Sequence, residues 1–205
     1  MSDPVFIMLA SFRNQYAEGP MGDLATDAAG NLYGTTSQLG TGNAGTLFEI
    51  SAGKVTMPVT FTGANGNDPS GLIADAAGNL YGVAQYGGAD GDGTLFEVAA
   101  GTGVLTTLVT FNGANGQNPS ALAVDAAGNF YGTTTFGGAN NDGTVFEIAA
   151  GTHALTTLFT FNGINGAAPG VLTVDAAGDL YGTINGAQTG NDGTVFEIAA
   201  GTNTP

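Results

Sequence analysis

The sequence predicts an all-β fold, a four-bladed β-propeller built from four-stranded repeats of about 50 residues. Two motifs recur in the same phase every 48 to 50 residues, and a strict period of that length is typical of propellers. No stretch has sustained helical periodicity, and 36 glycines disfavour long helices. The first motif is DAAGNLYG or a close variant, and it occupies Asp27 to Gly34, Asp75 to Gly82, Asp125 to Gly132 and Asp175 to Gly182. The second is GT(L/V)FE(I/V), and it starts at Gly45, Gly93, Gly143 and Gly193.

The third repeat predicts four strands in order. Residues 120–124 form the first strand, and a turn over Asp125 to Asn129 leads into the second strand at 130–136. In that turn the aspartate is expected to cap backbone amides, and the glycine supplies a positive φ. A Gly- and Asn-rich loop precedes the third strand at 143–150, and the fourth is expected at 155–161. Continuous rather than strictly alternating apolar residues in the strands predict sheets that are covered on both faces.

The N-terminal segment predicts how the ring closes. Residues 5–12 (VFIMLASF) align with the fourth strands that end at Phe61, Phe111 and Phe161, whereas the last unit has no fourth strand. We therefore expect residues 5–12 to pair with residues 193–199, within the chain or with a neighbouring molecule, and we favour closure within the chain. The whole chain, 1–205, is expected to be one repeat domain with units 13–61, 62–111, 112–161 and 162–205 plus the N-terminal strand.

The charge balance excludes several partners. The chain has 17 acidic residues but only Arg13 and Lys54 as cations, giving a formal charge of -15. Such a surface cannot displace counterions from a nucleic acid, and it disfavours anionic membranes. Cysteine is absent, and no apolar run is long enough for a transmembrane helix. The composition, with 9% charged residues, suits a secreted or surface protein.

The repeat motifs resemble a known family. LYGTT at Leu32 to Thr36, and GG followed by GTVFEI within Gly137 to Ile148, are similar to the GloVer-type tandem repeat of choice-of-anchor bacterial surface proteins. The resemblance implies a propeller-like fold, an extracellular or cell-surface location and no established biochemical activity. Neither an export signal nor an anchor is visible in this chain.

Repeated carboxylates are the candidate metal ligands. A ring formed by Asp27 and its three equivalents can in principle hold Ca²⁺, but capping of the turn is the simpler interpretation. The strand glutamates need solvent, backbone amides or a metal, because the chain has few cations to pair with them. We expect no required cofactor, with Ca²⁺ as the alternative and little effect of Ca²⁺ on folding. The candidate metal ligands are the loop aspartates Asp92, Asp142 and Asp192 and the strand glutamates Glu49, Glu97, Glu147 and Glu197.

Catalysis has little support in the sequence. The sole histidine, His153, lies in a turn without counterpart in the other repeats, and near-identical repeats give no asymmetric site. We therefore predict that the chain is not an enzyme. A polysaccharide-acting enzyme is the least favoured alternative.

The sequence favours a structural or adhesive surface module that can self-assemble into a homo-oligomer or filament. The alternative is a lectin-like propeller that binds glycans through shallow sites near Gln85, Tyr86, Thr135 and Phe136. Neither nucleic-acid binding nor membrane insertion is expected.

Overall fold

A computed structural model of the chain describes residues 6–12, 18–186 and 193–201. Its strands form four antiparallel sheets, here called blades 1 to 4, in the order of the sequence. Blade 1 contains β1 (Glu18–Thr26), β2 (Leu32–Gln38), β3 (Thr46–Ser51) and β4 (Lys54–Thr60), with a 3-10 turn at Thr41–Asn43. Blade 2 contains β5 (Asn67–Ala74), β6 (Leu80–Tyr86), β7 (Thr94–Val98) and β8 (Leu105–Thr110). Blade 3 contains β9 (Gln117–Val124), β10 (Phe130–Phe136), β11 (Thr144–Ile148) and β12 (Leu155–Thr160). Blade 4 contains β13 (Ala167–Val174), β14 (Leu180–Gly186) and β15 (Thr194–Ile198).

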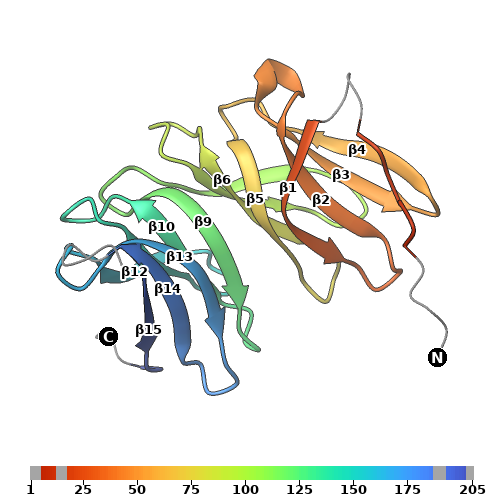
Figure 1. The fold of residues 1–205 in the computed structure, drawn as a ribbon. Helices are drawn as coiled ribbons and strands as arrows, with labels where there is room; N and C mark the ends of the chain where they lie inside the picture. Colours follow the sequence, from red (N-terminus) through yellow and green to blue (C-terminus); the bar gives the residue numbers. More distant parts are fainter. Residues whose placement is uncertain (1–5, 13–17, 187–192, 202–205) are drawn as a thin grey trace.

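The blades follow one another in an open series, with blade 1 at one end and blade 4 at the other (Figure 1). Each first strand packs beside the first strand of the next blade. The apolar core consists of three clusters, and each cluster fills the seam between two successive blades. The predicted all-β architecture of repeated sheets is therefore confirmed.

The DAAG motif forms the turn between the first two strands of each blade, as predicted. In blade 3 the N–H of Gly128 donates to the carbonyl of Asp125 at 3.1 Å, and Gly128 has a φ of 87°. Only glycine adopts this conformation at low cost, which explains the residue at this position. The first repeat spacing is 48 residues rather than 50 because Glu49 pairs with Thr56, whereas Glu97 pairs with Thr106. The turn between the third and fourth strands is thus two residues shorter in blade 1.

The glycine of each LYG motif makes room for the phenylalanine of each FE motif. Gly82 is the cross-strand partner of Phe96, and a Cβ at Gly82 would overlap the Phe96 ring. The same pair recurs as Gly34 with Phe48, Gly132 with Phe146 and Gly182 with Phe196. Two motifs separated in sequence are therefore the two halves of one packing unit.

A second phenylalanine links each blade to the blade before it. Phe61, which follows β4 of blade 1, packs on Phe96 of blade 2 with ring centroids 4.9 Å apart. The pairs Phe111 with Phe146 and Phe161 with Phe196 repeat this contact at the next two seams. Phe12 packs on Phe48 of blade 1 in the same way, at 4.7 Å.

The predicted closure of the ring within the chain is wrong. Among the described residues, blade 4 has three strands, and residues 6–12 form no strand. Residues 6–12 lie beside blade 1, at the opposite end of the series from β15 (Figure 1). The alignment of this segment with the fourth strands was nevertheless correct, because Phe12 takes the position of the phenylalanine at the end of a fourth strand. The four blades do not curve enough to bring the two ends of the series together.

We predict that Gly82→Ala destabilises the fold. The added methyl group must displace the Phe96 ring from a closely packed seam, which costs about 1–3 kcal/mol of unfolding free energy. Chemical denaturation of the variant measures this loss. Phe96→Leu serves as the control, and the double variant should lose less than the sum of the two single changes because the clash is then relieved. Strict additivity would contradict the proposed packing.

Candidate functional site

Blades 1 to 3 carry the same polar network at the end where the DAAG turn lies, here called the turn end, and blade 4 retains its two backbone hydrogen bonds to Asp175. In blade 1, Asp27 Oδ1 accepts hydrogen bonds from the N–H groups of Ala29 and Asn31, both at 2.9 Å. Asp27 Oδ2 accepts from Asn31 Nδ2 at 2.8 Å and from the Tyr33 hydroxyl at 3.1 Å. The carboxylate thus has four donors from its own hairpin. Blades 2 and 3 repeat this network around Asp75 and Asp125.

The repeated tyrosine lies between two carboxylates. The Tyr33 hydroxyl is 3.4 Å from Glu49 Oε1, and Thr56 Oγ1 donates to Glu49 Oε2 at 3.3 Å. Burial raises the pKa of Tyr33 to about 12, together with its hydrogen bond to Asp27 and the charge of Glu49. The phenol therefore keeps its proton at neutral pH and serves as a hydrogen-bond donor. This arrangement shows how strand glutamates are accommodated without cationic partners.

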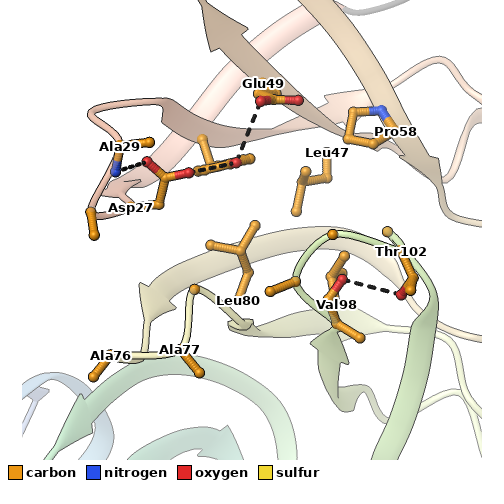
Figure 2. A pocket seen from close by; sticks show the side chains of 17 residues that line it. Asp27, Ala29, Leu47, Glu49, Pro58, Ala76, Ala77, Leu80, Val98 and Thr102 are labelled. Atoms are coloured by element: carbon orange, nitrogen blue, oxygen red, sulfur yellow. Dashed lines mark hydrogen bonds between the residues drawn. The ribbon is translucent and has the colours of Figure 1, made fainter.

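A cleft opens beside this network at the seam between blades 1 and 2, with a volume of about 520 Å³. Figure 2 shows Asp27, Glu49 and Pro58 of blade 1 facing Leu80 and Val98 of blade 2. One side of the cleft is lined with carboxylates and the floor is apolar. The backbone of residues 99–103, which form the turn after β7, completes the wall. A cleft of this size accommodates a small organic ligand.

The cleft arises because four side chains at this seam are smaller than their counterparts at the next seam. Tyr81 of blade 2 packs on Phe130 of blade 3 with ring centroids 4.4 Å apart, so an aromatic ring fills the space there. At the first seam these two positions are occupied by Tyr33 and the smaller Leu80. At the other three positions the first seam has Pro58, Val98 and Gly103, where the next seam has Leu108, Ile148 and His153 respectively.

The loop aspartates lie at the opposite end of the blades from the cleft. The carbonyl oxygen of Asp92 accepts a hydrogen bond from Asn118 N–H at 2.9 Å, and that of Asp142 accepts from Ala168 N–H at 3.0 Å. Each contact joins a loop to the following blade. These residues therefore have a structural role through their backbones. Asp192 lies outside the described residues.

The two sets of predicted metal ligands are not brought together. Asp92 precedes β7 by two residues, and Glu97 is the fourth residue of that strand. Five residues of extended chain span about 16 Å, too far for one ion to bind both side chains. Within the described ranges, no group of three or more acidic or histidine side chains is arranged to hold a metal ion. A role for Glu49, Glu97, Glu147 or Glu197 in metal binding stays a prediction.

The predicted glycan-binding residues end the second strands of blades 2 and 3. Tyr86 and Phe136 are exposed, and Gln85 and Thr135 beside them are half-buried. They lie at the loop end of the blades and do not reach the cleft. His153 is half-buried in the turn after β11 and has a φ of 55°. Sequence reasoning missed the cleft, although Pro58 and Val98, which line it, depart from the leucine and isoleucine that the other repeats have at these positions.

The chain belongs to the family described as the Gloeobacter/Verrucomicrobia repeat, which matches residues 19–204. The resemblance noted from the motifs is therefore confirmed. No curated protein shows significant similarity to the chain.

Solved structures with a similar fold are propeller-like. A catalytically inactive virginiamycin B lyase from Staphylococcus aureus, solved with quinupristin, is 17% identical with a TM-score of 0.64, covering 94% of this chain and 59% of the lyase. A chain of a nidogen/laminin complex is 17% identical with a TM-score of 0.59, covering 82% of this chain and 57% of that one. A gluconolactonase from Xanthomonas campestris is 17% identical with a TM-score of 0.55, covering 79% and 55%. The chain thus spans less than two thirds of each of these proteins.

The prediction that the chain is not an enzyme is contradicted by these comparisons. Two of these similar structures are enzymes, so a fold of repeated blades does not exclude catalysis. At 17% identity the likeness shows the fold alone. The near-identity of the repeats also does not make the seams equivalent, since one seam contains the cleft described above.

In the part of the chain that the structure describes, no helix has the length and apolarity needed to cross a bilayer.

We predict that Asp125→Ala destabilises the protein by about 0.5–2 kcal/mol, by analogy with the loss of a helix cap. The change leaves the N–H groups of Ala127 and Asn129 without their acceptor. Urea denaturation measures the effect. Asp90→Ala, at an exposed loop position, is the matched control and should be nearly neutral. Equal losses in the two variants would contradict the capping role.

The same network predicts a loss of stability in acid. The side-chain hydrogen bond from Asn31 lowers the pKa of Asp27 below 3.8. Burial tends to raise the pKa of Asp125, but hydrogen bonds from Asn129, Tyr131 and Ala127 outweigh it and lower the pKa below 3.8. A carboxyl whose pKa is lower in the folded state stabilises the fold above its unfolded-state pKa, and this contribution is lost as the pH falls through the folded-state pKa. Thermal denaturation between pH 6 and pH 2 should therefore show a steeper loss below about pH 4 in the wild type than in Asp125→Asn.

Calcium is predicted to have little effect on the folded state. A ligand that binds only the folded protein raises its stability by mass action. We expect the melting temperature to be nearly the same in EDTA and in millimolar CaCl₂. A rise of more than about ten degrees would indicate a tight Ca²⁺ site.

Proposed function

We propose that this chain is a structural or adhesive repeat module of the cell surface or extracellular space. The observation that carries the proposal is that the repeated carboxylates stabilise their own turns. Each of Asp27, Asp75 and Asp125 accepts hydrogen bonds from its own hairpin, and these bonds fix the shape of the hairpin in each blade. The acidic composition supports a role outside nucleic-acid binding.

Immunogold electron microscopy of the source cells, with an antibody raised against the purified chain, tests the location. We expect label on the outer surface or in the surrounding matrix. Label confined to the cell interior would overturn the proposal.

Carbohydrate binding is the second candidate function, and the cleft between blades 1 and 2 favours it. The carboxylate of Glu49 can accept hydrogen bonds from sugar hydroxyl groups. The apolar faces of Pro58 and Leu80 can pack against the C–H face of a sugar ring. The charge of -15 disfavours acidic sugars and therefore points to neutral ones.

A glycan array of neutral oligosaccharides tests this candidate, and two sets of variants distinguish its two sites. We predict that Leu80→Phe abolishes binding in the cleft while preserving the fold, because phenylalanine occupies the equivalent position in blade 3. Tyr86→Ala and Phe136→Ala should instead weaken binding at the exposed aromatic residues by about 3- to 10-fold, as expected for loss of one stacking contact. Absence of any retained glycan would exclude both sites.

A further inference from the structure

We propose that the outer face of blade 4 binds a second copy of this chain, whose residues 6–12 supply the fourth strand of that blade. The contact would reproduce, between molecules, the seams that join blades within the chain. This inference goes beyond the proposed function, because it concerns the partner of the two end faces and is tested by a different measurement.

The outer face of blade 4 presents residues that are buried at every internal seam. Leu47, Leu95 and Val145 are fully buried against the next blade, whereas the equivalent Val195 is 73% exposed. Val171 is 71% exposed, although its equivalent Ala121 is buried at the seam with blade 4. Blade 4 therefore has the apolar face of a seam, and within the described residues no further blade covers it.

The opposite face, on blade 1, is the other half of such a seam. Leu72 and Leu172 are buried against the preceding blade, whereas their equivalent Leu24 is 58% exposed. Phe12 already packs on Phe48, as Phe61 packs on Phe96. At the internal seams this position belongs to the residue that directly follows the fourth strand of the preceding blade. Residues 6–12 are thus placed as the last strand of a blade that would precede blade 1.

Residues 6–12 have the side chains and the register that blade 4 needs. Four consecutive apolar residues, Phe6 to Leu9, are exposed. Transferring the pairing of β11 with β12 to blade 4 places Ala10 opposite Val195 and Phe6 opposite Ile198. In blades 1 to 3 the N–H of the linking phenylalanine donates to the glycine before the third strand, at 3.0 Å each. In the proposed contact, the N–H of Phe12 would donate the corresponding hydrogen bond to the Gly193 carbonyl of the other copy.

The partner is a second copy because the two halves of the seam lie at opposite ends of one molecule (Figure 1). A contact between different faces of identical molecules is heterologous, so it propagates into a closed ring or an open filament. The apolar seam residues carry no charge, whereas each copy has a net charge of -15. Salt should therefore strengthen the association by screening the repulsion between copies.

The mass of the chain in solution tests the proposal. Light scattering coupled to size exclusion should give at least twice 20.2 kDa for the wild type, with a larger assembled fraction at high salt. Val195→Asp should weaken association at least tenfold, because it places a charge in the seam. Val104→Asp, the same change at an exposed position of blade 2 away from both faces, should assemble like the wild type. A monomeric wild type at all concentrations, or an unchanged mass for Val195→Asp, would overturn the proposal.

Disulfide trapping tests the register independently of the effects of Val195→Asp. The natural chain has no cysteine, so the double variant Ala10→Cys with Val195→Cys carries one defined pair. Directly opposed strand residues have Cα separations that a disulfide can bridge. Mild oxidation should give bands of two or more linked chains, and Ala10→Cys with Val104→Cys should not. Cross-linking within a single chain would overturn the proposal in favour of closure within the molecule.

Discussion

The stacking of a phenylalanine on a glycine in the neighbouring strand is the contact on which the rest of the architecture depends. Gly82 has no side chain, so the tip of the Phe96 ring occupies the space that a side chain would take there. There it meets Phe61 of the preceding blade, and the two rings hold the blades together. One glycine therefore determines both the packing within a sheet and the contact between sheets.

Hydrogen bonds from the turns add rigidity to this apolar framework. Asn79 donates to Asp75 in its own turn, while its amide oxygen accepts a hydrogen bond from Ala100 in the neighbouring turn. In blade 4, Asp179 takes the place of this asparagine and still accepts from Ala200. The two turns of a blade are thereby connected at the same end, and this end of the first seam carries the cleft. The polar network, which stabilises the turn in each repeat, therefore also places carboxylates beside the apolar floor of the cleft.

The sequence was sufficient to predict the sheets, because each is specified by local motifs whose spacing is regular. The capping role of Asp125 and the phase of Phe12 also followed from single residues in the repeat. Closure could not be predicted in this way, since it depends on the angle between successive blades, and that angle results from the packing of whole seams. The cleft was missed for a related reason. The loop aspartates stand out in the sequence because they recur, whereas Pro58 and Val98 matter because they differ from the residues that the other repeats have at these positions.

The division of the apolar core into three seams has a consequence for cooperativity. Each blade is stabilised by its immediate neighbours, so the energetics are those of a one-dimensional chain of coupled units rather than of a single globule. Blades 2 and 3 have two neighbours each and blades 1 and 4 have one. Protection of backbone amides against hydrogen exchange should therefore be graded along the series, with the central blades opening last. Unfolding of such a molecule begins at the end blades, and a partner that covers an end blade raises the stability of the whole molecule.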